Sequence, residues 1–261
     1  MTSAGSIFLP SFRLDGRQAI VTGASQGLGR HIALALAEAG ADLALVGRSL
    51  GSLESVAAEA HAMGRLAVCV TADLSQIDEV RKMTAQIAEV LGRIDILVNN
   101  AGTNIQQLAV DVTEEAWDTV MNINLKGAFF TAREVGLRMI AQGGGGRIVN
   151  IASQMAAVGF YKRSAYCASK AAVAAFTKVL ALEWAAEGIR VNAVGPTFID
   201  SPLARKVFED KEIHAAVLQR LPIGRLGRME EVAAAVVYLV SDGADLVTGH
   251  TLMVDGGWTA Q

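Results

Sequence analysis

Thr22-Gly23-Ala24-Ser25-Gln26-Gly27-Leu28-Gly29 is the stretch that decides the fold expected for this chain. The apolar run Ala19-Ile20-Val21 before it predicts a buried strand, and the apolar spacing from Ile32 to Ala39 after it predicts a helix. Glycines let a backbone turn tightly and approach a pyrophosphate, and the free N–H groups at a helix start favour anions. The stretch therefore predicts a dinucleotide-binding turn. A glycine turn that only packs a helix onto a sheet is the alternative, because the spacing is one residue longer than the common Gly-x-Gly-x-x-Gly.

Further along the chain, short apolar runs alternate with longer helical patterns. Continuous rather than alternating apolar runs are typical of parallel strands that are covered on both faces. With right-handed crossovers, they predict one α/β domain over residues 1–261: a Rossmann-type, doubly wound, seven-stranded parallel sheet. The strands expected after the first are Asp42–Val46, Leu66–Val70, Ile94–Val98, Arg147–Ile151, Ile189–Val194 and Thr251–Val254.

Composition narrows the classes of function. The 261 residues are 52% hydrophobic, and the net charge of −3 leaves no basic footprint for nucleic acid. The four histidines and two cysteines show no metal-ligand spacing, so no metal site is expected. Cys69 and Cys167 do not form a disulfide framework, which favours a reducing compartment, with the cytoplasm as the expected location.

No stretch of the sequence is expected to form a secretory signal or a membrane span. Residues 1–11 lack a basic start followed by an apolar core, and are expected to form an N-terminal arm. The most apolar stretch, Ala171–Ala186, is interrupted by Lys178 and Glu183 and is shorter than the ~20 residues that a membrane span needs. It is interpreted as a buried or interface helix.

Tyr166 and Lys170 are the strongest candidates for chemistry. Their spacing of four puts them on one face of a helix. A cation beside a phenol favours the phenolate, which suits proton exchange with a carbonyl or an alcohol. Other polar residues follow predicted strands, where ligands bind in this architecture: Asn99-Asn100-Ala101-Gly102 after the fourth strand and Ser153 after the fifth.

Taken in order, the glycine turn, Asn99-Asn-Ala-Gly102, Asn124, Ser153 and Tyr166-x-x-x-Lys170 resemble the short-chain dehydrogenase/reductase family over nearly the whole chain. The resemblance implies that Tyr166 is the general acid/base and that Lys170 lowers its pKa and holds the nicotinamide ribose. It implies that Ser153 hydrogen-bonds the substrate oxygen and that Asn124 fixes a helix kink and a water relay. Singly, Ser153 is better explained as a turn former and Asn124 as a satisfied helix residue, but together the motifs favour the catalytic interpretation.

The end of the second strand bears on the choice of cofactor. Gly47 occupies the place of the acidic residue that would bind the ribose of NAD, and Arg48 and Ser49 suit a 2′-phosphate, so NADP(H) is favoured over NAD(H). An exposed Arg48 with no such role is the alternative. The resemblance adds an adenine-contacting pair and a nicotinamide-contacting segment, in which Thr197 departs from the usual glycine. The expected cofactor-binding residues are Gly23, Ser25, Gln26, Gly27, Leu28, Gly29, Arg48, Ser49, Asp73, Leu74, Asn100, Ala101, Gly102, Tyr166, Lys170, Pro196, Ile199 and Ser201.

The resemblance also places a substrate lid at residues 197–221 and suggests a homotetramer. Pro196-Thr-Phe-Ile and the Val254-Asp-Gly-Gly-Trp258 ending look like family members that act on sugar acids. The expected function is NADP(H)-dependent interconversion of a ketone and a secondary alcohol, on a sugar acid or polyol. A 3-oxoacyl thioester reductase and a non-catalytic NADP(H)-binding sensor are the alternatives. Polar candidates to bind substrate hydroxyls or a carboxylate are Asn104, Gln106, Gln154, Lys162 and Arg163.

Overall fold

A seven-stranded, all-parallel sheet forms the centre of the molecule, in the order β3-β2-β1-β4-β5-β6-β7. The computed structural model describes residues 9–201, 208 and 211–261. The predicted α/β fold is confirmed, and the observed strands start or end within two residues of those expected. They are β1 Gln18–Thr22, β2 Asp42–Gly47, β3 Ala67–Thr71, β4 Ile96–Asn99, β5 Gly146–Ile151, β6 Ile189–Pro196 and β7 Thr251–Val254.

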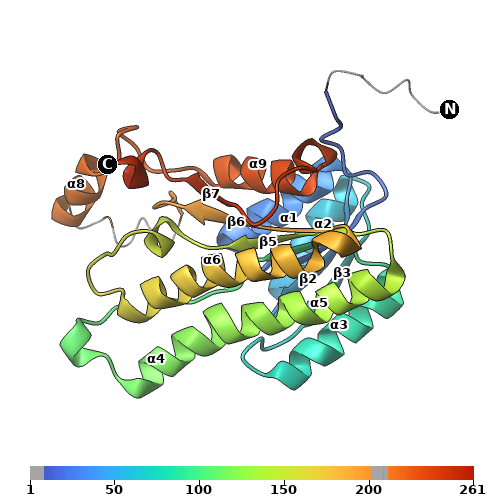
Figure 1. Cartoon of the computed structure of the whole chain (residues 1–261), viewed down its shortest axis with the longest axis horizontal. Helices are drawn as coiled ribbons and strands as arrows, with labels where there is room; N and C mark the ends of the chain where they lie inside the picture. Colours follow the sequence, from blue (N-terminus) through green and yellow to red (C-terminus); the bar gives the residue numbers. More distant parts are fainter. Residues whose placement is uncertain (1–8, 202–207, 209–210) are drawn as a thin grey trace.

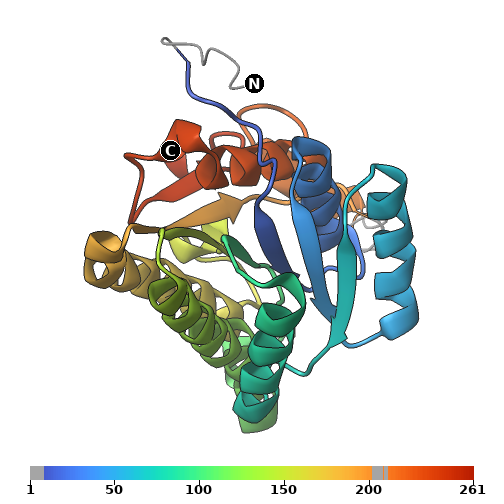
Figure 2. The same cartoon turned by 90° about the vertical axis from the view of Figure 1, so that its right-hand side faces the viewer.

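Helices cover both faces of this sheet (Figures 1 and 2). One face carries α1 (Gly27–Ala39), α2 (Leu50–Ala62) and α9 (Met229–Val240). The other carries α3 (Ile77–Leu91), α5 (Ala128–Gln142) and α6 (Ser164–Trp184). The shorter helices are α4 (Glu114–Met121) and α8 (Lys211–Gln219), with 3-10 turns at Ala109–Asp111, Gln154–Ala156, Ala185–Glu187, Asp242–Ala244 and Trp258–Ala260.

The pleat of the strands divides the core into two layers. Successive side chains of a strand point to opposite faces, so Ala19 and Val21 of β1 pack towards α1 and α9. Ile20, between them, packs towards α3 and α5 on the other face, and all three are fully buried. This two-sided burial explains why the strands are continuous apolar runs in the sequence.

Strand order creates the crevice in which the site lies. β1 and β4 are neighbours, and the chain proceeds from them towards opposite edges of the sheet, so their carboxyl ends leave a crevice between them. Asn100, just after β4, closes the base of this crevice because its Nδ2 donates to the Thr22 carbonyl at 3.0 Å. The Thr22 hydroxyl in turn accepts from the Asn100 N–H at 3.0 Å and the Ala101 N–H at 3.1 Å.

The α6 helix lies directly below the sheet in Figure 1, above α4 and α5. Among the described residues it is the one helix, taken to Glu187, that is long and apolar enough to cross a membrane. One side of it is nevertheless built into the fold against β6, with buried polar residues at Ser169, Lys170 and Thr177. Each of these side chains hydrogen-bonds inside the protein, which is typical of a core helix.

Candidate active site

The glycine turn after β1 fits the phosphates of a dinucleotide. Gly23 and Gly27 have φ of 65° and 55°, a conformation that residues with a Cβ rarely adopt. A Cβ on Gly29 would collide with the Gly23 carbonyl, so this position must be glycine for the turn to close against α1. At Gly27, by contrast, a Cβ would meet no atom within 4 Å, so that side of the turn is open to a ligand. Because α1 starts at Gly27 and Gln26 makes no side-chain cap, its first N–H groups can face an anion.

The end of β2 lies beside this turn and bears on the choice of cofactor. A Cβ on Gly47 would lie 3.7 Å from the Ser25 Cβ and 3.3 Å from Leu53, so a larger residue would be crowded. Arg48 and Ser49 follow and are exposed, and Ser49 Oγ lies 3.0 Å from Ser52 Oγ. Arg48 makes no hydrogen bond or ion pair within the part of the chain that the structure describes. Its guanidinium is therefore available to a ligand.

Asp73 and Leu74, the two residues after β3 that are expected to contact adenine, differ in burial. Leu74 is buried, and Asp73 is half-buried, with its Oδ1 accepting from the Ser75 N–H at 3.0 Å. The Leu74 carbonyl lies where a Cβ on Gly127 would be, which brings this loop against the helix pair α4 and α5.

Tyr166 lies in the first turn of α6, facing the residues that follow β5. A side-chain hydrogen bond joins it to Ser153, and this bond and the charge of Arg163 favour the phenolate. Burial has the larger effect and raises the pKa of Tyr166 above its ordinary value. The Ser153 hydroxyl also accepts from the Met155 N–H at 3.1 Å, which fixes its position at the start of a 3-10 turn.

Lys170 is one helical turn beyond Tyr166 and is almost completely buried. Its Nζ donates to the Ile151 carbonyl at 2.6 Å and lies 5.7 Å from the centroid of the Tyr166 ring. Burial lowers the pKa of Lys170 to about 8. Arg163 is a second cation near Tyr166, and its charge lowers the pKa of Tyr166.

Asn124 lies in a π-helical turn, Asn122–Gly127, that joins α4 to α5. Its Oδ1 accepts from the Thr103 N–H at 2.7 Å, and its Nδ2 donates to the Thr103 carbonyl at 2.8 Å. The same Nδ2 donates to Ser169 Oγ at 3.2 Å. Asn124 thus ties the loop after β4 to α6, and a Cβ on Gly102 would lie 3.2 Å from Asn124 Oδ1 and 3.7 Å from Lys170 Nζ. Three segments of the chain therefore meet at Lys170.

The segment expected to contact the nicotinamide leaves β6 at Pro196. The Cβ of Thr197 does not disturb the turn, since the φ of Thr197 is not positive. Among the described residues, Lys162 is the one non-glycine residue with a positive φ. Ile199, near the start of the predicted lid, forms a bridge with Gly227, six residues beyond its end. Of that lid, residues 202–207 and 209–210 lie outside the described residues, as do residues 1–8 of the expected N-terminal arm. Ser201 is described and half-buried.

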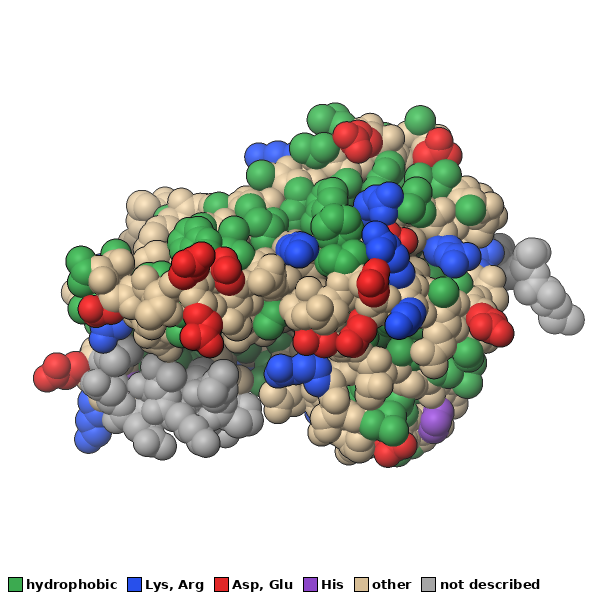
Figure 3. Space-filling model, turned by 90° about the horizontal axis from the view of Figure 1, so that it is seen from below, with side chains coloured by type: hydrophobic (Ala, Val, Ile, Leu, Met, Phe, Trp, Pro, Cys, Tyr) green, Lys and Arg blue, Asp and Glu red, His purple; other side chains and the backbone are tan. Residues whose placement is uncertain are grey.

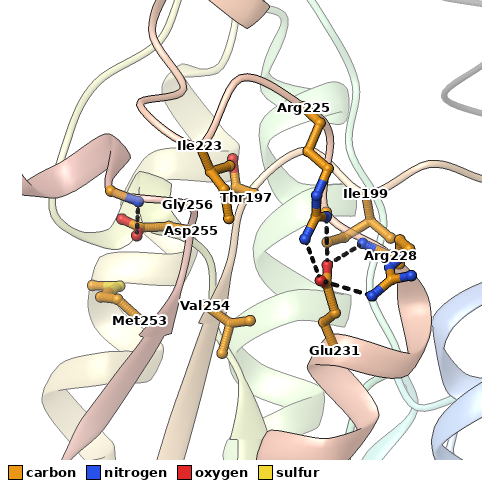
Figure 4. A pocket seen from close by; sticks show the side chains of 12 residues that line it. Thr197, Ile199, Ile223, Arg225, Arg228, Glu231, Met253, Val254, Asp255 and Gly256 are labelled. Carbon is orange, nitrogen blue, oxygen red and sulfur yellow. Dashed lines mark hydrogen bonds and ion pairs between the residues drawn. The ribbon is translucent and has the colours of Figure 1, made fainter.

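An ion cluster holds the base of this segment against α9 (Figure 4). Glu231 accepts from Arg225 at 2.6 and 3.0 Å and from the Arg228 N–H at 2.8 Å. These bonds lower the pKa of Glu231 to about 2. The cluster borders a pocket at the carboxyl ends of β6 and β7, lined also by Thr197 and Gly256.

The structure separates the polar candidates for substrate binding. Lys162, Asn104 and Gln106 are exposed, whereas Gln154 and Arg163 are buried beside Ser153 and Tyr166. Sequence reasoning missed Ser169, whose hydroxyl donates to the Tyr166 carbonyl at 2.7 Å while accepting from Asn124. Its position within Tyr-x-x-Ser-Lys is the one signal that could have identified it.

Comparison with known proteins agrees with this geometry. A family model described as enoyl-(acyl carrier protein) reductase matches residues 23–259. The 2-dehydro-3-deoxy-D-gluconate 5-dehydrogenase of Escherichia coli K12 is 38% identical over 98% of this chain and 100% of its own length. An NAD-dependent glycerol dehydrogenase of Listeria innocua is 42% identical over 97% of each chain.

The fold is shared with a solved relative. The gluconate 5-dehydrogenase of Burkholderia cenocepacia, solved in complex with NADP and tartrate, is 35% identical, with a TM-score of 0.92 over 96% of this chain and 98% of its own. The ordered motifs, the parallel sheet and these relatives agree. This chain belongs to the short-chain dehydrogenase/reductase family and is an oxidoreductase that acts on CH–OH groups with a nicotinamide cofactor.

Proposed function

We propose that this enzyme is an NADP(H)-dependent dehydrogenase that interconverts a ketone and a secondary alcohol on a sugar acid or polyol. The observation that carries the reaction type is the convergence of Ser153, Tyr166 and Lys170 at the carboxyl end of β5, next to the glycine turn. The substrate class rests on the relatives, whose names specify a deoxy-gluconate, glycerol and gluconate.

The residues divide the chemistry between them. A nicotinamide bound in the crevice supplies or accepts the hydride. During reduction, Ser153 and Tyr166 hold the substrate oxygen, and Tyr166 gives it the phenolic proton as negative charge develops there. The raised pKa of Tyr166 keeps the phenol protonated, which suits this direction. Lys170, fixed by the Ile151 carbonyl, holds its ammonium beside the Tyr166 ring and is the residue to bind the nicotinamide ribose.

The preference for NADP(H) is supported by the end of β2. An exposed guanidinium at Arg48, the adjacent Ser49 hydroxyl and the absence of a carboxylate at Gly47 suit a 2′-phosphate. NADP is bound in the Burkholderia relative, whereas the Listeria relative is named as NAD-dependent. Asp73, Leu74, Pro196, Ile199 and Ser201 complete the proposed cofactor site.

The remaining proposals concern the lid and the assembly. Residues 197–221 are proposed to close over the substrate, because this segment follows the proposed nicotinamide contact Pro196 and has the place of the lid in the family that the chain resembles. A homotetramer is supported by large exposed apolar side chains on α4, α5 and α6, namely Trp117, Leu137 and Leu182. Figure 3 shows hydrophobic side chains among scattered charges on the side of the molecule that is lowest in Figure 1. Cys69 and Cys167 are free thiols, which suits the cytoplasm.

A 3-oxoacyl thioester reductase is the second candidate, favoured by a 3-oxoacyl-[acyl-carrier-protein] reductase of Thermotoga maritima that is 38% identical over 94% of this chain and 98% of its own length. A non-catalytic NADP(H)-binding sensor, the third possibility, would not need the acid–base residues Ser153, Tyr166 and Lys170. One experiment separates the three: consumption of NADPH or NADH by the purified protein with keto-sugar acids, ketoses and a 3-oxoacyl thioester. Turnover with keto-sugar acids or ketoses supports the proposal, and turnover only with the thioester supports the second candidate.

Variants at two tyrosines complete the test. Tyr166→Phe should lower kcat by roughly 10²–10⁴-fold, the usual contribution of general acid–base catalysis, while cofactor binding measured by NADPH fluorescence remains. Tyr161→Phe is the matched control, because the Tyr161 side chain is 75% exposed. Tight NADPH binding without turnover on any substrate would favour the sensor.

A further inference from the structure

Two polar side chains beside Tyr166 are buried without partners. Gln154 is 1% exposed and Arg163 is 9% exposed. Both amide atoms of Gln154, and Nε and Nη1 of Arg163, have no hydrogen-bond partner in the described part of the chain. Buried polar groups are nearly always paired, and an unpaired buried charge is more costly still. Gln154 follows Ser153 directly, in a turn that packs against α6, and Arg163 is at the start of α6, so two unpaired polar side chains at the candidate active site point to a ligand that pairs them.

The backbone fixes where Arg163 lies. Lys162 has φ of 59°, and its carbonyl accepts from the Gln107 N–H at 3.3 Å, so the chain turns sharply just before Arg163. Lys162 is consequently exposed, while Arg163, at the N-cap of α6, is buried. The Arg163 carbonyl accepts from the Cys167 N–H at 2.8 Å, which anchors it to the first turn of the helix.

Arg163 lies near Tyr166, but no hydrogen bond joins the two side chains among the described residues. It precedes Tyr166 by three residues, the spacing of neighbours on one helix face. Its charge acts on the Tyr166 phenol, which places the guanidinium within electrostatic reach of the hydroxyl. Gln154 directly follows Ser153, the other residue at the proposed substrate oxygen.

The chemistry of the two side chains defines the ligand. A guanidinium offers a planar fork of donors and no acceptor, which matches the two oxygens of a carboxylate. No described aspartate or glutamate forms an ion pair with Arg163. A primary amide offers both a donor and an acceptor, which suits a hydroxyl group. The substrate ketone occupies Ser153 and Tyr166, so the carboxylate must be a second group on the same molecule.

We propose that Arg163 binds the carboxylate of a keto-sugar acid and Gln154 an adjacent hydroxyl, so that Arg163 selects acids over neutral ketoses and polyols. This inference rests on the proposed function and narrows its substrate class. A different role for Arg163, in which its charge only adjusts Tyr166, would affect acidic and neutral substrates equally, because both use the same phenol.

The test compares two substrates that differ at one group. 5-Keto-D-gluconate and L-sorbose share a carbon skeleton, with a carboxylate in the first replaced by a hydroxymethyl group in the second. The quantity measured is the ratio of kcat/KM for the acid to that for the ketose, with NADPH. Arg163→Gln should lower this ratio about 10–100-fold, the usual value of a charged hydrogen-bonded pair. Arg163→Lys, which keeps the charge but loses the fork, should lower it less.

Lys162→Gln is the matched control, because it removes the same charge from the adjacent, exposed residue. Its ratio should stay within about twofold of that of the wild type, as for surface charges in general. An unchanged ratio in Arg163→Gln, with both substrates slowed alike, would overturn the inference while leaving the proposed function intact. If circular dichroism shows that Arg163→Gln is not folded, the ratio is measured with Arg163→Lys instead: a lowered ratio supports the inference and an unchanged ratio overturns it. A wild-type enzyme that reduces neither substrate, nor any other ketone, would overturn both.

Discussion

The Lys170 ammonium donates a 2.6 Å hydrogen bond to the carbonyl of Ile151, the last residue of β5. This bond joins the middle of α6 to the strand that presents Ser153, so the two halves of the acid–base site are positioned by one contact. It also holds the charge of Lys170 in a buried place, where burial lowers its pKa to about 8.

The first prediction concerns stability against pH. Between the folded pKa of about 8 and the ordinary value of 10.5, the unfolded chain binds more protons at Lys170 than the folded chain does. The free energy of unfolding contributed by this residue should therefore rise with pH across that window. Lys170→Met should remove this rise, as measured by urea unfolding at pH values from about 7 to 10. Lys178→Met, at an exposed position of α6, is the control, and parallel profiles for Lys170→Met and wild type would contradict the prediction.

The second prediction concerns the π-helical turn. Asn124→Ala leaves the Thr103 N–H and carbonyl without their partner and should lower the free energy of unfolding by about 1–3 kcal/mol. It should also lower kcat, because the loop after β4 is no longer fixed beside Lys170. Asn122→Ala, two residues earlier and only half-buried, should change stability by less than about 0.5 kcal/mol. Equal losses of unfolding free energy and of kcat in Asn124→Ala and Asn122→Ala would contradict this prediction, because they would show that any substitution in this turn is harmful.

The third prediction concerns the cofactor. If Arg48 binds the 2′-phosphate, Arg48→Gln should raise KM for NADPH about 10–100-fold through loss of a charge-assisted hydrogen bond. KM for NADH should remain nearly constant, because that cofactor has no phosphate at this place. Steady-state kinetics with both cofactors supply the measurement and its internal control. A similar rise for both cofactors would place Arg48 outside the phosphate site.

The fourth prediction separates two glycines that both have open space beside them. Gly27→Ala introduces a Cβ on the open side of the turn at φ of 55°, so it should cost about 1 kcal/mol of stability and weaken NADPH binding. Gly51→Ala lies in α2 at an ordinary φ, with no atom within 4 Å of the new Cβ. It should leave binding unchanged and raise stability by roughly 0.5–1 kcal/mol. Thermal unfolding with and without NADPH measures both effects.

The sheet was predictable from the sequence because two-sided burial makes each strand a continuous apolar run. The errors lie at strand ends, where a side chain is apolar but the backbone has left the ladder. β3 begins at Ala67 rather than Leu66, whose side chain is half exposed. Ile94 is buried like a strand residue, but its N–H bonds Gln142 Oε1 at 3.1 Å, so β4 begins later.

The candidate site was predictable as a set of motifs but not as a set of contacts. Lys162 and Arg163 are adjacent cations and carry equal weight in the sequence. A single positive φ at Lys162 turns one to solvent and the other beside Tyr166. Backbone geometry of this kind leaves no mark on composition or periodicity. The effect of the Arg163 charge on the pKa of Tyr166 could therefore not be predicted from the sequence.

The bridge between Ile199 and Gly227 and the ion cluster at Glu231 close the base of the segment between them. The described part of this segment has further anchors, because Val217 and Leu221 pack with Trp258 near the C-terminus and the Ile223 N–H donates to the Gly256 carbonyl at 3.2 Å. Lengthening the chain between such anchors costs little, about 0.6 kcal/mol for each doubling. The substrate chamber can therefore change in size through this segment while the anchors and the acid–base residues keep their places.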